Sequence, residues 1–204
     1  SRRKSVSPHD STGANLIVQV KANKVMRVVP LENEDVNECW IADRDRFSYE
    51  ALNGDARLTT PMLKQGGEGK AVSWKTALDY VAQGLSQIRS QHGAASIGAL
   101  GSAHATVEEL HLLAKLVRGL GSENIDFRAR HADFTNVAAP GQARWLGTPI
   151  ASLAGLQRVF VIGSFLRKDH PLFAQRIRQA ARKGAKVHSL NAVHDDWAMP
   201  MAEG

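Results

Sequence analysis

The sequence is poor in cysteine and in long apolar runs, and both absences limit what the chain can do. Cys39 is the single cysteine among 204 residues. It excludes an internal disulfide, and alone it cannot hold a metal or an iron–sulphur cluster, which needs several thiolates or imidazoles. We interpret Cys39 as a small buried hydrophobe. No run approaches the roughly 18 apolar residues of a membrane-spanning helix, and the amino terminus lacks the apolar segment of a secretory signal. We therefore expect a cytoplasmic chain without direct membrane insertion.

Motifs of catalytic and metal sites are also missing. No Gly-x-Gly-x-x-Gly follows a predicted strand, and Ser102, Ser164 and Ser189 do not lie in a Gly-x-Ser-x-Gly nucleophile motif. His104 and His111 lie two helical turns apart, without an acidic or thiol partner at ligand spacing. We predict no catalytic, cofactor-binding or metal-ligating residue.

The chain is basic, with a formal net charge of +6 and an isoelectric point near 9.7. Such a charge is typical of nucleic-acid binding, but no zinc-finger, recognition-helix or aromatic RNA-binding motif accompanies it. The basic residues concentrate at residues 1–4 and on a predicted helix at residues 172–183, where they lie mostly opposite the apolar face: Arg176, Arg178, Arg182 and Lys183. We expect a solvated helix face or one that docks an acidic partner, and no nucleic-acid partner.

The first part of the chain predicts short β-strands. Residues 1–12 are polar and aperiodic, which favours a flexible leader. Two β-branched runs at residues 16–20 and 25–29, separated by a turn, indicate a hairpin. An acidic loop should lead to a short helix at residues 42–52. We place a small β-hairpin subdomain at residues 13–60.

The second part, residues 61–204, predicts a partial α/β domain. Ser73 is a plausible N-cap, and Thr106 with Glu109 forms a capping box. The patterns predict helices from Ser73 to about His92 and at residues 107–120 and 172–183, and strands at residues 96–100, 124–127, 158–163 and 186–190, with a possible short helix near residues 138–145. Alternating strands and helices favour a doubly wound, mostly parallel, Rossmann-like sheet.

We expect residues 74–190 to form one α/β layer structure. Its predicted core includes Leu78, Val81, Leu110, Leu113, Val159, Val161, Ile177 and Val187. Because this α/β domain is partial, we expect it to lack later strands or helices that would cover its sheet. The chain should therefore expose apolar surface or self-associate. Turns at residues 101–104 and 163–167 follow predicted parallel strands, where such folds bind ligands, although a lone Gly there is usually only turn geometry.

The stretch at residues 43–78 joins the two parts and carries the most specific motifs. It reads Arg57-Leu58, then Pro61, a basic loop, Ser73-Trp74 and an amphipathic helix. This order resembles the segment that opens the large α/β domain of the molybdopterin oxidoreductase superfamily. More narrowly, the spacing of Val36-Asn37-Glu38, Trp40, Asp43 and Arg46-Phe47 resembles that in the large iron–sulphur subunit of the respiratory NADH-quinone oxidoreductase, complex I.

The resemblance implies a non-catalytic scaffold section that packs against other peripheral-arm subunits on the cytoplasmic side of the inner membrane. It implies NADH:quinone oxidoreductase activity for the whole complex, with 2Fe-2S and 4Fe-4S clusters in the parent chain outside this section and no cofactor within it. The alternative is a fragment of a true molybdopterin-dependent oxidoreductase of the formate dehydrogenase or nitrate reductase type. A third possibility is a free-standing basic α/β binding module.

The chain departs from the resembling families where they hold cofactors. Pterin-binding members continue the Gly-Ser turn as Asn-Pro and end the next strand in Asp-Pro-Arg, whereas this chain reads Phe165-Leu166 and Asn191-Ala192-Val193. Relatives with an extra tetranuclear cluster carry Cys-x2-Cys-x3-Cys-x27-Cys around the hairpin. Alignment places these four positions at Ser7, Asp10, Ala14 and Ala42. We expect the former cluster cavity to be filled by side chains from the leader and the Trp40 segment.

Overall fold

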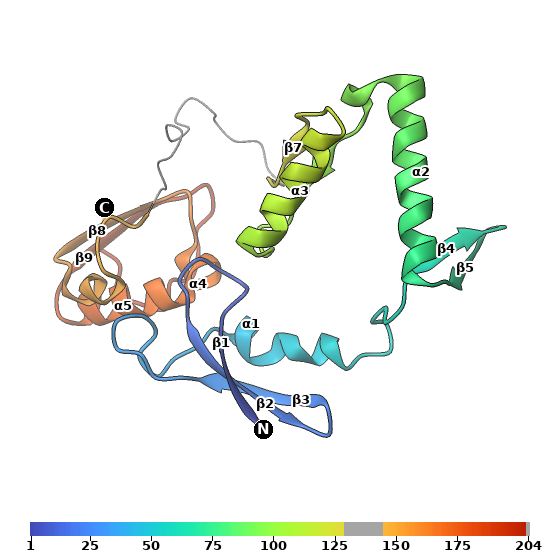
Figure 1. The fold of residues 1–204 in the computed structure, drawn as a ribbon. Helices are drawn as coiled ribbons and strands as arrows, with labels where there is room; N and C mark the ends of the chain where they lie inside the picture. The colour runs from blue at the N-terminus through green and yellow to red at the C-terminus, as the bar shows by residue number, and fades with distance from the viewer. Residues whose placement is uncertain (129–144, 203–204) are drawn as a thin grey trace. The chain divides into compact units, whose positions relative to one another are not determined.

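The structure is a computed structural model that describes residues 1–128 and 145–202. The chain folds as two compact units, one formed by Ser1–Asp55 with Ala138–Gly204 and the other by Ala56–Val137 (Figure 1). Both units mix helices and strands, and the N-terminal region is rich in β-strand. The predicted helix at residues 138–145 falls almost wholly outside the described residues. None of the helices in the described ranges is long and apolar enough to cross a membrane.

The first unit begins with an antiparallel sheet in the order β1-β2-β3. Strand β2 (Asn15–Lys21) and strand β3 (Lys24–Pro30) form the predicted hairpin. Its turn is tight because Ala22 and Asn23 both adopt positive φ angles, as two-residue hairpin turns require. One face of the sheet is apolar, and Leu16 and Val28 from it form a buried cluster with Ile41.

The first residues differ from the predicted flexible leader. Strand β1 (Arg2–Val6) pairs with β2 in a register that runs from Arg2 opposite Gln19 to Val6 opposite Asn15. All residues of β1 are exposed, so the strand is held by backbone hydrogen bonds rather than by burial of its side chains. The hydrophobic pattern therefore contained no signal for it.

The acidic loop after β3 is organised by Asn37, which is 2% exposed. Its amide nitrogen donates to the carbonyl oxygens of Leu31, Glu38 and Trp40, each at 3.1 Å. The loop leads into helix α1 (Asp43–Phe47) and the 3-10 helix η1 (Ser48–Leu52), which confirms the predicted short helix. Cys39 is exposed, so its interpretation as a buried hydrophobe is wrong.

The rest of the first unit is a small α/β layer. It comprises η3 (Ile150–Gly155), β8 (Arg158–Ile162), α4 (Leu166–Asp169), α5 (Pro171–Arg182) and β9 (Lys186–Leu190). Strands β8 and β9 are parallel, and α5 connects them in sequence, as predicted. The core of this layer contains Leu153, Ile177, Ala181 and Val187.

The second unit contains a hairpin and two longer helices. The hairpin joins β4 (Met62–Gln65) to β5 (Glu68–Ala71), and η2 (Ala94–Ser96) follows helix α2 (Trp74–His92). Helix α2 begins at the Ser73 cap, whose hydroxyl accepts from the Thr76 amide. Helix α3 (Val107–Gly119) begins with the capping box that the sequence predicts. Strands β6 (Ala99–Leu100) and β7 (Ile125–Asp126) are parallel but short.

The expectation of one continuous layer is not met in the described residues. The pairs β6–β7 and β8–β9 are separate two-stranded sheets that belong to different units. Val161, Ile177 and Val187 are buried as predicted, whereas Leu78 is 60% exposed and Val81 is 51% exposed. Helical periodicity identified the apolar face of α2, but it cannot show whether anything covers that face.

Candidate functional site

The four positions aligned with cluster ligands are all buried in the first unit. Ala14 is 0% exposed, Ala42 is 4% exposed and Ser7 is 7% exposed, and the side chain of Asp10 is 4% exposed. The Ser7 amide donates to the Ala14 carbonyl at 2.8 Å, which holds the segment after β1 against the start of β2. Ala42 directly precedes α1. The predicted positions are therefore brought into one buried region.

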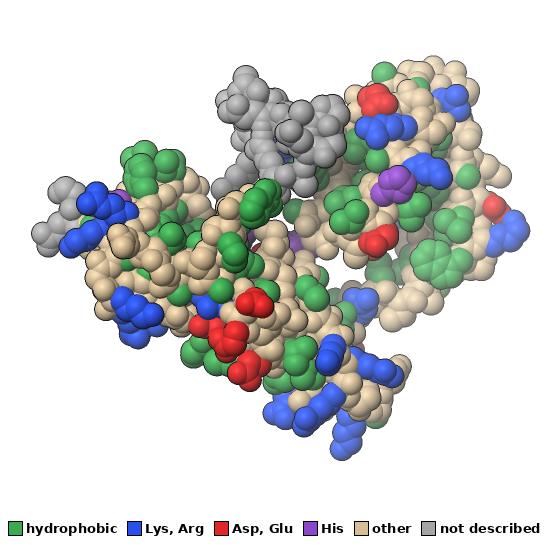
Figure 2. Space-filling view, turned by 60° about the vertical axis from the view of Figure 1, so that its left-hand side comes forward, with side chains coloured by type: hydrophobic (Ala, Val, Ile, Leu, Met, Phe, Trp, Pro, Cys, Tyr) green, Lys and Arg blue, Asp and Glu red, His purple; other side chains and the backbone are tan. Residues whose placement is uncertain are grey.

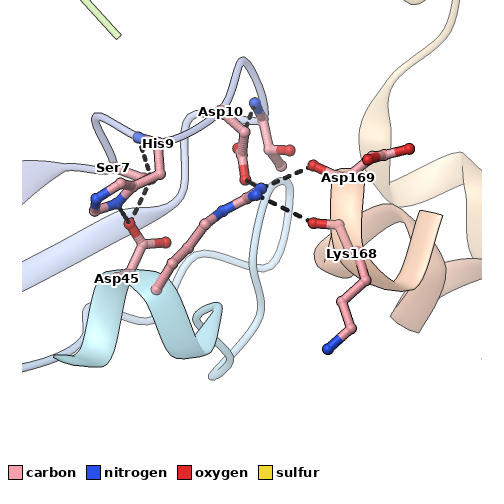
Figure 3. Close-up of polar contacts among 8 residues, drawn as sticks. Ser7, His9, Asp10, Asp45, Lys168 and Asp169 are labelled. Carbon is pink, nitrogen blue, oxygen red and sulfur yellow. Dashed lines mark hydrogen bonds and ion pairs between the residues drawn. The ribbon is translucent and has the colours of Figure 1, made fainter. Parts of the chain in front are cut away.

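One group of polar contacts in this region is made by the carboxylate of Asp45 on α1 (Figure 3). Its Oδ1 accepts from the Ser7 hydroxyl at 2.6 Å and lies 2.8 Å from Nδ1 of His9. The Asp45 side chain has no exposed surface. Because the Ser7 hydroxyl proton is directed at a carboxylate, Ser7 is not placed as a nucleophile activated by an imidazole base.

Arg44 on α1 makes a second set of contacts, which join the segment after β1 to the end of α4. Nη2 of Arg44 donates to Oδ2 of Asp10 at 2.6 Å. The Arg44 guanidinium also donates to the backbone carbonyl of Lys168 at 3.1 Å and to that of Asp169 at 2.8 Å. These carbonyls lie at the end of α4, where helical carbonyl groups lack partners within the helix. Arg44 therefore ties three segments together, and its partners Asp10, Lys168 and Asp169 are labelled in Figure 3.

The contacts of Asp10 also lower the pKa of its carboxyl group. Burial raises the pKa of Asp10, but hydrogen bonds from the Arg44 guanidinium and from Thr12 outweigh burial, so the pKa lies below its usual value. The Thr12 amide donates to Oδ1 of Asp10 at 2.9 Å. Both carboxylate oxygens of Asp10 are thus engaged by donors of the chain itself.

These residues do not fit an iron–sulphur cluster at the aligned positions. Ala14 and Ala42 have no donor atom, the Ser7 hydroxyl is bonded to Asp45, and the Asp10 carboxylate is bonded to Arg44. Within residues 1–128 and 145–202, no group of three or more His, Cys, Asp or Glu side chains could hold a metal ion. Such clusters are held mainly by converging cysteine thiolates.

Sequence reasoning missed the residues of α1 that complete this region. The expectation that leader side chains lie here is met by Ser7 and Asp10, but Trp40 is 50% exposed and only its neighbours Ile41 and Ala42 are buried. Arg44 and Asp45 supply the remaining contacts. The available signal was the charged run Asp43-Arg44-Asp45-Arg46, which directly follows an aligned ligand position.

Arg176, on the basic helix at residues 172–183, is buried rather than solvated. Arg176 is 6% exposed, and its Nη1 donates to Oε1 of Glu38 at 3.2 Å. Arg176 also donates to the carbonyl of Glu34, and Gln179 donates to Oε2 of Glu38 at 3.0 Å. Arg176 is therefore not solvated. Its acidic partner is the chain's own loop after β3.

The hydrogen-bond donors of the turn after β8 are bonded to a carboxylate of the chain itself. Gly163 has a positive φ of 65°, and the Ser164 hydroxyl and the Phe165 amide donate to Oδ2 of Asp169 at 2.7 and 3.0 Å. Donors that could face a phosphate thus hold a carboxylate instead. Asn191 donates to the Ser164 carbonyl at 3.1 Å. This arrangement does not fit the binding of a pterin nucleotide phosphate at the turn.

The turn after β6 is likewise held by its own residues. The His104 amide donates to the Ser102 hydroxyl oxygen at 3.1 Å. A Cβ added at Gly101 would lie 3.1 Å from the Leu110 side chain, so the turn packs closely against α3. Neither turn brings together catalytic side chains in the described residues.

Comparison with known proteins identifies the class. Residues 57–202 match the Molybdopterin oxidoreductase family, and the chain belongs to this family. Residues 1–50 match the family described as NADH-ubiquinone oxidoreductase NDSU1/NuoG-like, 4Fe-4S domain. The resemblance that the sequence motifs indicated is confirmed.

The relatives narrow the assignment. The chain is 31% identical over 192 residues to a subunit of the NADH-quinone oxidoreductase of Rickettsia felis, covering 94% of this chain and 28% of that protein. It is 30% identical over 197 residues to the NADH-ubiquinone oxidoreductase 75 kDa subunit of Reclinomonas americana, covering 88% of this chain and 27% of that protein. A Staphylococcus aureus protein named as a formate dehydrogenase is 27% identical, with 92% of this chain and 20% of that protein covered. The chain thus spans about a quarter of the length of these relatives.

One solved structure supports the fold. Acetylene hydratase from Pelobacter acetylenicus matches with a TM-score of 0.66 and 17% identity, over 93% of this chain and 27% of that chain. At this identity the match shows the fold alone.

Proposed function

We propose that the chain is a non-catalytic scaffold section of the large peripheral-arm subunit of a proton-translocating NADH-quinone oxidoreductase. The observation that carries this proposal is the order of the family matches, with the NDSU1/NuoG-like match at residues 1–50 followed by the molybdopterin oxidoreductase match at residues 57–202. The two relatives that share about 30% identity, both subunits of such oxidoreductases by name, add support. In this proposal the complex transfers electrons from NADH to quinone through 2Fe-2S and 4Fe-4S clusters held elsewhere in the parent chain and assembly.

The section itself takes no part in electron transfer and holds no cofactor. The contacts of Ser7 and Asp10 support this, because the chain's own polar side chains occupy the aligned ligand positions. We place the parent on the cytoplasmic side of the inner membrane, attached through other peripheral-arm subunits and without membrane insertion or nucleic-acid binding of its own.

We further propose that both parallel strand pairs belong to a doubly wound sheet in the parent, with a domain boundary near residue 60. Parallel sheets are normally covered on both faces. Several strand residues are instead strongly exposed: Phe160 at 61%, Ile162 at 65% and Leu190 at 60%. Additional segments of a longer chain would cover them.

The scaffold role is tested by activity. The 204-residue chain should give no turnover of NADH above a buffer blank with ferricyanide or a quinone analogue as acceptor. The parent chain, purified under native conditions, should bring NADH-oxidising subunits with it. Turnover by the short chain would refute the non-catalytic role, and a parent that purifies without such subunits would refute the assembly.

The second candidate is a section of a true molybdopterin-dependent oxidoreductase, which the 27% identity to the protein named as a formate dehydrogenase favours. Pterin analysis of the full-length protein separates the two. Our proposal predicts no pterin, since Asp169 holds the turn donors. Stoichiometric pterin would support the second candidate.

A further inference from the structure

One face of the three-stranded sheet carries a group of cations. Arg2 lies opposite Gln19, and Gln19 lies opposite Arg27, so these side chains form a row across the sheet on one side. Lys4 follows on the same side of β1, because alternate residues of a strand share a face. We call the exposed residues Arg2, Lys4, Lys21, Lys24 and Arg27 the basic face.

The basic face has no counter-charge of its own. None of its side chains forms an ion pair with another residue in the described ranges, and β1, β2 and β3 contain no Asp or Glu. Lys21 lies directly opposite Lys24 at the end of the hairpin, a like-charge arrangement that destabilises a sheet. Figure 2 shows Lys and Arg side chains gathered at the lower edge of the view, where this sheet lies.

The face is directed away from the core of its unit. Leu16 and Val28 point to the opposite side, where they pack with Ile41. Ile17 and Val29 lie opposite one another and next to the charged row, and both are half-buried. A flat surface that mixes aliphatic groups with long cationic side chains can form both apolar and ionic contacts.

We propose that the basic face docks onto an acidic protein surface of a neighbouring subunit. This inference rests on the proposed function, in which the parent belongs to an assembly. Residues 1–31 contain no Phe, Trp or Tyr, so the face lacks the stacking groups of single-strand nucleic-acid sites and the aromatic anchors common in membrane-surface segments. Uncompensated cations beside aliphatic side chains complement a protein surface that carries carboxylates.

A zero-length carbodiimide cross-linker tests the contact in the native assembly, because it joins amines to carboxylates that touch. Lys4, Lys21 and Lys24 should cross-link to Asp or Glu residues of one other subunit. Lys64 and Lys70, exposed on the β4–β5 hairpin, are the matched control and should not join the same carboxylates. Cross-links of the basic face only to a second copy of the chain, or none at all, would overturn the proposal.

A charge-removal variant supplies an independent readout. The parent with Arg2, Lys4, Lys21, Lys24 and Arg27 all changed to Gln should bind its neighbour at least about tenfold more weakly, while Lys64→Gln with Lys70→Gln should not. If the wild-type parent brings NADH-oxidising subunits and the charge-removal variant retains them equally well, the docking face is wrong and the proposed function stands. If the wild-type parent brings none, both fail.

A membrane surface and nucleic acid are the other anionic partners that the basic face could bind, and a binding assay with the 204-residue chain tests both. The 204-residue chain is mixed with vesicles of phosphatidylcholine and phosphatidylserine and, separately, with duplex DNA. We expect binding that is lost by about 150 mM salt, where exposed charges are screened beyond about 8 Å. Binding that persists at this salt and disappears in the charge-removal variant would assign the face to a membrane or to nucleic acid and overturn the protein partner.

Discussion

The two compact units bury their side chains in contrasting ways. In the first unit, the buried set combines apolar residues with polar ones: Ser7, Thr12, Asn37, Asp45 and Arg176. In the described part of the second unit, the buried residues are Ile97, Val117 and the polar Ser122. Its two long helices expose large apolar groups instead: Trp74, Leu78, Tyr80, Val81, Ile88, Val107, Leu112 and Leu116.

This difference shows that polar side chains contribute much more to burial in the first unit than in the second. In the first unit, buried polar contacts join distant segments, because Arg176 meets Glu38 and Asp45 meets Ser7, although strands β8 and β9 leave large apolar side chains exposed. The second unit has well-capped helices whose apolar faces remain available for packing. Local signals therefore locate these helices, whereas most of the stability of a helix comes from packing its apolar face against a second surface. The predictions below test this contrast, from the largest expected effect on stability to the smallest.

Removing Arg176 should have the largest effect. Arg176→Met leaves the Glu38 carboxylate and the Glu34 carbonyl without their partner, and we expect a loss of about 3 kcal/mol in the free energy of unfolding. Urea unfolding followed by circular dichroism measures it. Arg182→Met, at an exposed position of the same helix, is the control and should change stability by less than about 0.5 kcal/mol. Equal effects would contradict the buried ion pair.

Asn37→Ala should cost about 2 kcal/mol. It removes the donor to three carbonyl groups and the acceptor of the Asn15 amide at 2.9 Å. The measurement is again urea unfolding. Gln91→Ala, an amide removed from an exposed position of α2, should be nearly neutral, and an unchanged midpoint for Asn37→Ala would show that the loop does not depend on this side chain.

The Asp10 contact should make the first unit sensitive to acid. Because the pKa of folded Asp10 lies below its ordinary value, the carboxylate stabilises the fold above the unfolded pKa of about 4. This contribution is lost as the pH falls through the lower folded pKa. Asp10→Asn should therefore be less stable than wild type at pH 7, and the gap between their melting temperatures should close in acid. A gap independent of pH would contradict the role of the Arg44 pair.

The exposed face of α2 should show the smallest effect on stability. Leu78→Ser with Val81→Ser should change the free energy of unfolding by no more than about 0.5 kcal/mol per site. The same substitutions should reduce self-association of the chain, measured by light scattering over a concentration series. A wild-type chain that stays a monodisperse monomer at high concentration would contradict the availability of this face.

The sequence was sufficient where structure depends on neighbouring residues. The Thr106–Glu109 capping box and the β-branched hairpin both occur as predicted, because their determinants lie within a few residues of one another. The strand at residues 158–162 was recognisable from its apolar run.

The sequence was insufficient where partners lie far along the chain. Arg176 and Glu38 are 138 residues apart, so a helix-face pattern could predict a solvated face or an acidic partner but could not identify Glu38 as that partner. Strand β1 depends on backbone pairing with β2, which leaves no trace in side-chain hydrophobicity. In the candidate site, the resemblance located the four aligned positions. It could not reveal that Asp45 would bond to Ser7 and Arg44 to Asp10.

The central claim is that the buried region around Ser7, Asp10, Ala14 and Ala42 folds around its own polar side chains without an iron–sulphur cluster. Iron and sulphide analysis of protein purified under anaerobic conditions, combined with paramagnetic resonance of the reduced sample, tests it most directly. We predict neither iron nor sulphide and no reduced-state signal, because Ala14 and Ala42 offer no ligand and Ser7 and Asp10 are engaged by Asp45 and Arg44. Stoichiometric iron and sulphide bound to this chain would contradict the account.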